Sequence, residues 1–376
     1  MKVVADDKIP FLKGVLEPFA DVQYLPGKEI TKKDIADADA LIVRTRTKCN
    51  ESLLSGTKVK FIATATIGFD HIDTKWCENN GIAWTNAPGC NSGSVYQYIA
   101  SVMVSLAAKH NFNLFDRSLG VIGVGNVGKK IVKLGEWLGM RVMLNDPPRE
   151  RNESTCGFIS LDGIIRECDI ITCHVPLNLD GKDKTYHLIN DKILSRLNKG
   201  TILINSSRGE VVDNKSLLNA LTNRSRLSGA VLDVWENEPD INIDLLAKLD
   251  FATPHIAGYS ADGKINGTTM SIHALSRYFG LPLQNWEPTD LPLPENHTFT
   301  VDCLKKSIQE VLSEVILHTY KVDEDDARLR KSVETFEKQR GNYPLRREFH
   351  AFTLNLVHNH SNLDKILGNL GFKIKT

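Results

Sequence analysis

The sequence predicts an α/β protein whose parallel sheets are covered by helices on both faces. Short apolar runs rich in valine and isoleucine alternate with helical segments along most of the chain. Strands that are apolar throughout, and not only at every second position, are typical of parallel sheets buried on both faces. One such strand leads through a glycine-rich turn into a helix, which indicates a doubly wound sheet.

The length of the chain, 376 residues, predicts more than one domain. We expect a discontinuous first domain at residues 1–94 and 257–284, and a second domain at residues 95–256. A helix expected at Ala261–Phe279 returns the chain to the first domain. The sequence pattern of residues 285–376 differs from that of the first two domains, and these residues are expected to form a small α+β domain. A linker around Leu281–Pro294, where this domain begins, is marked by four prolines: Pro282, Pro288, Pro292 and Pro294.

Each element of the first domain follows from a local pattern. β-Branched apolar runs bounded by polar or glycine residues predict strands, and longer apolar or amphipathic runs predict helices. We expect a flavodoxin-like α/β domain with strands at Lys2–Ala5, Ala40–Val43 and Phe61–Thr64. The long helix Ser92–Lys109 leads into the second domain.

The second domain shows the strand–helix alternation most regularly, over residues 119–252. Strands are expected at Leu119–Ile122, Arg141–Asn145, Ile170–Cys173, Thr201–Asn205 and Gly229–Asp233. Helices between them are expected at Val127–Leu138, Leu161–Arg166 and Lys215–Leu221.

In the third domain, apolar residues recur at helical spacing over residues 301–315 and predict an amphipathic helix. They are Val301, Leu304, Ile308, Val311 and Val315. The apolar face of this helix could be the core of a small domain or the seam between two copies of the chain. The two interpretations are compatible, because small domains gain stability by pairing. A strand at Ala351–Val357 and a short helix–strand ending complete the domain.

Composition excludes several classes of function. Charged residues make up 24% of the chain and the formal net charge is zero, so there is no bulk attraction to nucleic acid or to an acidic membrane surface. Apolar runs are too short to span a membrane, and the N-terminus becomes charged too early for a signal peptide. The seven cysteines are scattered without the spacing of a metal site. This predicts reduced thiols, no metal and a cytoplasmic location.

Glycines at Gly-x-Gly-x-x-Gly spacing follow the strand at 119–122. Gly123 makes the tight turn, Gly125 allows a pyrophosphate to approach the backbone, and Gly128 allows helix and strand to pack closely. The helix that starts near Asn126 directs free N–H groups and its positive end at the pyrophosphate. Three glycines at this spacing also occur in ordinary turns. The flanking strand and helix, and a second strand that ends in an acid, favour a dinucleotide site.

That acid is Asp146, at the end of the second strand. Its carboxylate can accept hydrogen bonds from both ribose hydroxyls, and its charge repels a 2′-phosphate. We therefore expect a Rossmann-type domain at residues 95–256 that binds NAD and not NADP.

Three further segments follow predicted strands at their carboxyl ends, where open α/β sheets bind ligands. They contribute Arg208, the acids Asp233, Glu236 and Glu238, and His255. A guanidinium can bind a substrate carboxylate in a bidentate manner, and a histidine held by a carboxylate can take a hydroxyl proton during hydride transfer. Taken singly, each could be a surface ion pair, a loop residue or a solvated carboxylate. Their joint occurrence after a dinucleotide turn favours oxidation of a 2-hydroxy acid.

These motifs resemble those of the D-isomer-specific 2-hydroxyacid dehydrogenases, at the glycine turn and in all three later segments. The resemblance implies that Arg208, Glu238 and His255 are the catalytic set, and that Asp233 contacts the nicotinamide carboxamide. It implies further cofactor-binding residues at Asn126, Val127, Val175, Ser206, Ser207 and Gly258. Val175 stands where the family often has a threonine, which leaves only a backbone contact at that position.

Within that family, the segments at residues 87–91, 146–148 and 255–259 resemble a member whose substrate carries a phosphate. This implies NAD-dependent oxidation of a small phosphorylated 2-hydroxy acid by a homodimer paired through residues 285–376. Basic and hydroxyl residues after the strand at 40–43 are candidate phosphate ligands, or else an exposed strand end with alternating polar side chains. The substrate-binding candidates are Arg44, Thr45, Thr66 and Tyr259.

Two alternatives stay open. The chain could act on another 2-hydroxy acid, such as 3-phosphoglycerate, or it could be a catalytically inactive protein that binds and senses NAD. Arg208, Glu238 and His255 argue against the inactive alternative, because such a protein needs none of them.

Overall fold

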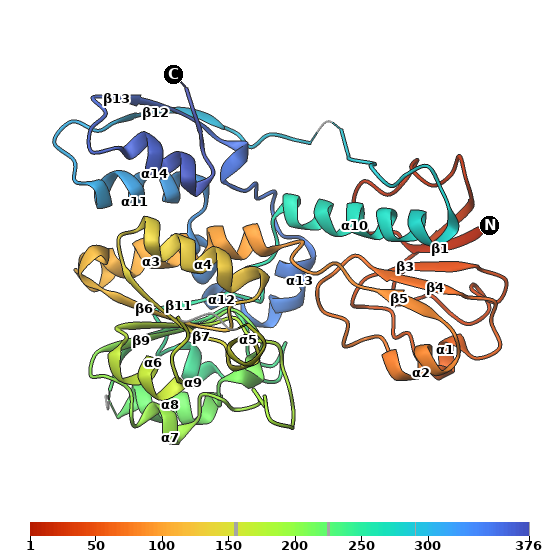
Figure 1. Cartoon of the computed structure of the whole chain (residues 1–376), viewed down its shortest axis with the longest axis horizontal. Coiled ribbons are helices and arrows are strands. Elements are labelled where there is room, and N and C mark those ends of the chain that lie inside the picture. The colour runs from red at the N-terminus through yellow and green to blue at the C-terminus, as the bar shows by residue number, and fades with distance from the viewer. Residues whose placement is uncertain (154–156, 224–225, 290, 376) are drawn as a thin grey trace. The chain divides into compact units, whose positions relative to one another are not determined.

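The computed structural model describes residues 1–153, 157–223, 226–289 and 291–375. The chain divides into two compact units. The first comprises Met1–Asn91 and Ser260–Pro292, and the second comprises Ser92–Tyr259 and Leu293–Thr376. The predicted α/β class with parallel sheets is confirmed in both units (Figure 1).

The first unit is built on a parallel sheet with the flavodoxin-like order β2-β1-β3-β4-β5. Its strands are β1 (Lys2–Asp6), β2 (Asp21–Leu25), β3 (Ala40–Val43), β4 (Phe61–Thr64) and β5 (Ala83–Thr85). Helices α1 (Glu51–Leu54) and α2 (Thr74–Asn79) lie on one face, and α10 (Ala261–Phe279) lies on the other (Figure 1). The predicted β1, β3 and β4 are confirmed. The sequence does not predict the edge strands β2 and β5, because neither contains a buried residue.

The main sheet of the second unit is also parallel, in the order β11-β10-β9-β8-β6-β7. Its strands are β6 (Ser118–Ile122), β7 (Arg141–Asn145), β8 (Ile170–Cys173), β9 (Thr201–Asn205), β10 (Leu227–Leu232) and β11 (Phe251–Ala252). The chain passes from β6 to β7 on one side and then crosses to β8 on the other. Strands β6 and β8 therefore form the switch point of a doubly wound sheet, where such folds bind ligands.

Helices connect these strands. The predicted helices are confirmed as α3 (Ser92–Lys109), α4 (Asn126–Trp137), α6 (Leu161–Glu167) and α8 (Asn214–Thr222). Shorter helices are α5 (Pro147–Asn152), α7 (Asp191–Leu194) and α9 (Ile243–Leu246). Every residue of α3 from Ser92 to Val104 is buried, because this helix packs against α4 and also against the C-terminal region.

The C-terminal region adds a parallel sheet of order β12-β13-β14 to the second unit. Its strands are β12 (Thr298–Asp302), β13 (Thr353–Val357) and β14 (Lys373–Ile374). Its helices are α11 (Ile308–Thr319), α12 (Val322–Lys331), α13 (Phe336–Gly341) and α14 (Leu363–Leu370). The expected strand before a helix–strand ending is confirmed as β13, α14 and β14.

One expectation for this region is wrong in part. The helix predicted over residues 301–315 begins only at Ile308, because Ser307 starts a capping box there. Val301 is instead buried in β12, and Leu304 is exposed in the connection that follows. The apolar face of α11 packs against α3 within one continuous core. Of the two interpretations of this helix, the structure supports the core of its own chain.

Among the described residues, no helix combines the length and the apolar character needed to cross a bilayer. The described cysteines are all free and buried, as expected of reduced thiols: Cys49, Cys77, Cys90, Cys168, Cys173 and Cys303. Cys156 lies outside the described residues.

Candidate active site

The three glycines of the turn between β6 and α4 differ in their surroundings. Gly123 has a left-handed backbone (φ +86°), and a Cβ there would lie 2.6 Å from the carbonyl oxygen of His174. A Cβ on Gly128 would overlap the carbonyl oxygen of Gly123. Around the Cβ position of Gly125, which caps α4, no described atom from beyond the glycine and its own chain neighbours lies within 4 Å. This open space lies at a helix N-terminus, whose free N–H groups can bind a pyrophosphate.

Separate replacement of Gly125 and Gly128 by alanine is expected to distinguish binding from packing. Gly128→Ala should lower the free energy of unfolding by about 3 kcal/mol, because two backbone segments must move apart. Gly125→Ala should change it by no more than about 0.5 kcal/mol. The added methyl group fills the space that the pyrophosphate needs, so Gly125→Ala should raise KM for NAD about tenfold or more. Chemical denaturation and initial rates at varied NAD measure the two effects. Equal destabilisation by both substitutions would contradict this interpretation.

Asp146 connects the end of β7 to the glycine turn. One carboxylate oxygen accepts a hydrogen bond from the N–H of Val124 (2.8 Å), and the other caps α5 through the N–H of Arg149 (3.1 Å). Arg149, which could otherwise attract a 2′-phosphate, is paired with Glu153 (Nε–Oε1 2.7 Å). The acid is thus fixed at the strand end, where the sequence predicts the ribose hydroxyls of NAD.

Other predicted cofactor residues follow the neighbouring strands. The Ser206 hydroxyl, after β9, is buried and has no hydrogen-bond partner among the described residues, whereas Ser207 is satisfied within its own loop. A buried hydroxyl without a protein partner can bond to a bound cofactor. The Val175 side chain, after β8, lies 2.7 Å from the Cβ position of Gly123 and forms an apolar wall of the turn. The unpaired hydroxyl and the open space at Gly125 both fit a bound dinucleotide.

The structure brings Glu238 and His255 together. Nδ1 of His255 lies 2.8 Å from Oε2 of Glu238, and the other carboxylate oxygen accepts a hydrogen bond from the N–H of Trp235 (2.9 Å). The histidine side chain is 32% exposed and the glutamate side chain 19%. Because Nδ1 faces the carboxylate, Nε2 is the nitrogen that a substrate can reach. The pair has the arrangement of an acid–base catalyst.

Asp233 fixes the loop that carries His255. Its buried carboxylate accepts hydrogen bonds from the N–H groups of Ile256 (2.7 Å) and Ala257 (3.0 Å) and from the Thr253 hydroxyl (2.7 Å). Burial raises the pKa of Asp233, and these hydrogen bonds together with the charge of His255 oppose that shift. The carboxylate retains the capacity to accept a further bond. Asp233 can therefore hold the loop that carries His255 and also make the expected contact with the nicotinamide carboxamide.

Arg208 lies in the loop after β9, next to the loop that carries Glu238. Its Nη1 donates to the carbonyl oxygen of Ser207 (2.9 Å). A Cβ on Gly209 would overlap the carbonyl oxygen of Trp235, so the two loops are in backbone contact. The three predicted catalytic residues therefore come from loops at the carboxyl ends of the adjacent strands β9, β10 and β11.

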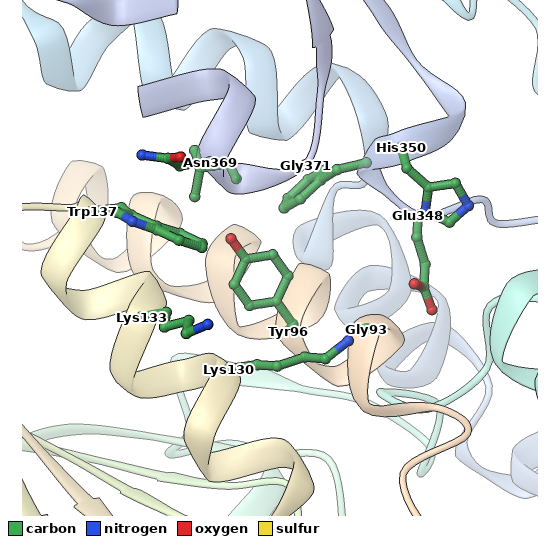
Figure 2. Close-up of a pocket in the computed structure, with 11 residues that line it drawn as sticks. Gly93, Tyr96, Lys130, Lys133, Trp137, Glu348, His350, Asn369 and Gly371 are labelled. Carbon is green, nitrogen blue, oxygen red and sulfur yellow. The ribbon is translucent and has the colours of Figure 1, made fainter. Parts of the chain in front are cut away.

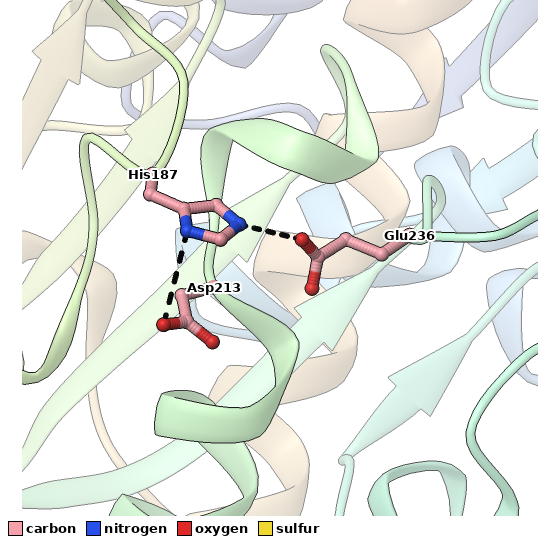
Figure 3. Close-up of side chains that lie close together, drawn as sticks. All are labelled: His187, Asp213 and Glu236. Atoms are coloured by element: carbon pink, nitrogen blue, oxygen red, sulfur yellow. Dashed lines mark hydrogen bonds and ion pairs between the residues drawn. The ribbon is translucent and has the colours of Figure 1, made fainter.

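Glu236, another acid predicted for this region, pairs with a different histidine. Figure 3 shows its carboxylate beside Nε2 of His187 (2.6 Å), while Nδ1 of the same ring faces Asp213 (3.9 Å). Three such side chains could hold a metal ion. However, Glu236 also accepts a hydrogen bond from the N–H of Asn214 (2.9 Å), and Asp213 caps α8 through the N–H of Ser216. We interpret His187, Asp213 and Glu236 as a structural contact that fixes the loop after β10 to the start of α8.

Three predicted substrate residues lie in the first unit. Arg44, after β3, forms a bidentate pair with the fully buried side chain of Asp6 (Nε–Oδ2 3.2 Å, Nη2–Oδ1 3.1 Å). Thr45 is exposed, and the Thr66 hydroxyl is bonded to that of Thr64 (2.7 Å). Asp6 thus takes up two N–H groups of Arg44, and such a pair occurs at a binding site and at an exposed strand end alike, so both interpretations stay open.

The fourth, Tyr259, lies in the second unit against residues that sequence reasoning missed. Its ring packs edge-on against Tyr343 and lies 5.7 Å from the guanidinium of Arg340. Arg346 reaches the backbone just after His255. No motif signals these C-terminal residues, because only folding brings them to the histidine loop.

A cavity of about 290 Å³ opens elsewhere in the second unit, with the Tyr96 ring at its centre (Figure 2). Aromatic and basic side chains from α3, α4 and the C-terminal region line it, including Tyr96, Lys130, Lys133, Trp137 and Phe349. None of the predicted site residues belongs to this lining. The candidate chemistry therefore lies at the carboxyl edge of the main sheet and not in the cavity.

The sequence is similar to a well-defined group of enzymes. A family model described as "D-isomer specific 2-hydroxyacid dehydrogenase, NAD binding domain" matches residues 97–257, and a domain of unknown function matches residues 291–371. The chain is 50% identical to the erythronate-4-phosphate dehydrogenase of Bacteroides thetaiotaomicron, over 94% of this chain and 99% of that protein. It is 42% identical to the protein of the same name from Escherichia coli, over 99% and 98% of the two chains.

Solved structures with the same fold hold the cofactor. D-lactate dehydrogenase from Aquifex aeolicus, complexed with NAD and lactic acid, is 27% identical with a TM-score of 0.60, over 74% of this chain and 96% of that one. The NAD⁺-bound 3-phosphoglycerate dehydrogenase of Entamoeba histolytica is 25% identical with a TM-score of 0.64, over 78% and 99%. These relatives support the prediction of an NAD site in the second unit.

Proposed function

This chain belongs to the family of erythronate-4-phosphate dehydrogenases, and we propose that it oxidises 4-phospho-D-erythronate with NAD. The product is (R)-3-hydroxy-2-oxo-4-phosphooxybutanoate, in the biosynthesis of pyridoxal 5′-phosphate (vitamin B6). The observation that carries this proposal is the 50% identity over 94% of the chain. The pairing of His255 with Glu238, on the same sheet as a dinucleotide turn, supports it.

Each catalytic residue has a defined role in this reaction. Bound NAD would supply the acceptor, C4 of the nicotinamide ring, for the hydride that leaves C2 of the substrate. Nε2 of His255 takes the proton of the C2 hydroxyl group, so the C–H and O–H bonds break as the carbonyl forms. Glu238 orients the imidazole through Nδ1 and stabilises its protonated form. Arg208 binds the substrate carboxylate and polarises the C2 oxygen.

The remaining predicted residues are proposed to bind the two reactants. The N–H groups of Asn126 and Val127, at the start of α4, hold the pyrophosphate, and Asp146 holds the ribose. Val175, Ser206, Ser207, Asp233 and Gly258 complete the cofactor site. Arg44, Thr45, Thr66 and Tyr259 bind the substrate, with the arginine as the cation for its phosphate.

Turnover of the purified protein tests the substrate. With 4-phospho-D-erythronate, NAD and a 2-oxo acid that reoxidises the cofactor, it should form the 2-oxo product, which mass spectrometry can quantify. 3-Phosphoglycerate and glycerate serve as the comparison substrates. Activity on one of these but not on 4-phospho-D-erythronate would overturn the substrate and leave the reaction class intact. Turnover of none of the three would instead favour an inactive NAD-binding protein.

We also propose that the protein is a cytoplasmic homodimer paired through residues 285–376, the third of the domains expected from the sequence. The apolar face of α11 is buried within the chain, so pairing requires another surface of this region. The β12 side chains Thr298, Thr300 and Asp302 are exposed and offer one. Light scattering of the full chain tests the pairing, and a monomeric mass would contradict it.

A further inference from the structure

The segment that follows α13 lies against the loop that carries His255. Arg346, in this segment, is only 4% exposed. Its Nη2 donates to the carbonyl oxygens of Ala257 (2.6 Å) and Ile256 (3.3 Å) and to the Ser94 hydroxyl. Ser94 donates in turn to the same Ala257 carbonyl (2.9 Å). A C-terminal arginine thus binds the two residues that follow the catalytic histidine.

The loop that carries His255 is therefore held through both its backbone N–H groups and its carbonyl oxygens. Asp233 binds the N–H groups of Ile256 and Ala257, and Arg346 binds their carbonyl oxygens. His255 itself has a left-handed backbone (φ +56°), which a non-glycine residue keeps only when its surroundings enforce it. Loss of the guanidinium would leave two buried carbonyl groups without a charged donor, and the loop would relax.

Arg346 is itself fixed by a buried group of aromatic and acidic side chains. Its guanidinium lies 4.6 Å from the ring centroid of Tyr320 and 5.6 Å from that of Tyr343. Asp325 accepts hydrogen bonds from both phenol hydroxyls (2.9 and 2.6 Å). Burial alone would lower the pKa of Arg346, but the tyrosines, Asp325 and Asp233 outweigh it and the net shift is upward. The guanidinium is a charged anchor with little freedom to move.

We propose that Arg346 is a positioning residue for the dehydrogenation, through which the C-terminal region holds His255 in line with Glu238. The inference rests on the catalytic role proposed above for His255. It gives a task in catalysis to a region that matches a domain of unknown function. Because a displacement of about 1 Å costs about 10²-fold in rate, the effect falls on kcat and not on the binding of NAD.

Arg346→Lys tests the proposal, because lysine keeps the charge but ends one bond short of the position of Nη2, which makes all three hydrogen bonds, and has no planar group to lie over Tyr320. We expect kcat to fall by about 10- to 100-fold while KM for NAD stays within about twofold. Arg330→Lys is the matched control. Arg330, on α12, also donates to two backbone carbonyls, those of Leu246 (2.7 Å) and Leu249 (3.0 Å), which are outside the histidine loop. This variant should keep its kcat.

A double-mutant cycle with His255→Asn tests whether Arg346 affects kcat through His255. If Arg346 acts through His255, Arg346→Lys has no further effect on the residual rate of His255→Asn. Losses that multiply, or a kcat that Arg346→Lys leaves unchanged, would overturn the inference. A His255→Asn variant with full activity would instead refute the proposed function, so the two failures are distinguishable.

Ser94→Ala provides a second test, which decides the question if Arg346→Lys does not fold. It removes the hydroxyl that accepts a hydrogen bond from Nη2 of Arg346 and donates one to the Ala257 carbonyl, while the arginine itself is kept. We expect kcat to fall by about threefold or more, and this loss to disappear in the His255→Asn background. An unchanged kcat in folded Ser94→Ala would overturn the inference.

Discussion

Replacement of Arg208 by lysine is expected to lower kcat/KM for the phosphorylated substrate by about 10³-fold. The charge is kept, but an ammonium cannot form the bidentate pair with the substrate carboxylate while it also polarises the C2 oxygen. The loop cannot shift to compensate, because the backbone at Gly209 is in contact with that of Trp235 and Glu236. Steady-state kinetics at saturating NAD and varied substrate measures the loss.

The matched control for this prediction is Arg196→Lys. Arg196 is an exposed arginine that pairs with Asp162 (Nη2–Oδ2 2.9 Å) outside the candidate site. We expect its kinetics to equal those of the unchanged protein. If Arg208→Lys lowered kcat/KM no further than this control, Arg208 would not be the carboxylate ligand.

The sequence predicted the interior of both large sheets better than their edges. Strands such as β3, β6 and β9 are buried at every residue, so they stand out as continuous apolar runs. Strands β2 and β5 are only partly buried, and β11 has just two residues, so none of them leaves such a pattern. The helix predicted over 301–315 shows a further limit. Apolar spacing alone could not separate a buried strand residue such as Val301 from the helix that begins after Ser307.

The candidate site, too, could be predicted from the sequence only in part. Residues next to strand ends, such as Arg208 and His255, could be predicted because parallel strands bring their carboxyl ends to one edge. Spacing alone did not decide which acid faces the histidine, since Glu236 and Glu238 are two positions apart. The family resemblance pointed to Glu238, and only this acid meets His255. Arg346 lies 89 residues beyond Ala257 in the chain. Its contact depends on how the C-terminal region packs, which no local pattern encodes.

Replacement of His255 by asparagine is expected to lower kcat by about 10²- to 10⁴-fold, because asparagine cannot take the hydroxyl proton. It should also remove the limb of the pH profile that the proton transfer to His255 produces. Initial rates from pH 5 to 9, at saturating substrate and NAD, measure both effects. A profile with the same limb in this variant would assign the proton transfer to another group.

Glu238→Gln tests the role of the negative charge of this carboxylate, because the substitution removes the charge and nearly keeps the shape. Glutamine has nearly the same size and can still accept a hydrogen bond from Trp235 or His255, but it no longer favours the protonated imidazole. The protonated ring that forms during the oxidation therefore loses its stabilising charge, and we expect kcat to fall by about tenfold. Glu236→Gln is the matched control, because that acid faces His187 from the same loop and should leave kcat unchanged. An equal loss of kcat in both variants would show that the catalytic base does not depend on the charge of Glu238.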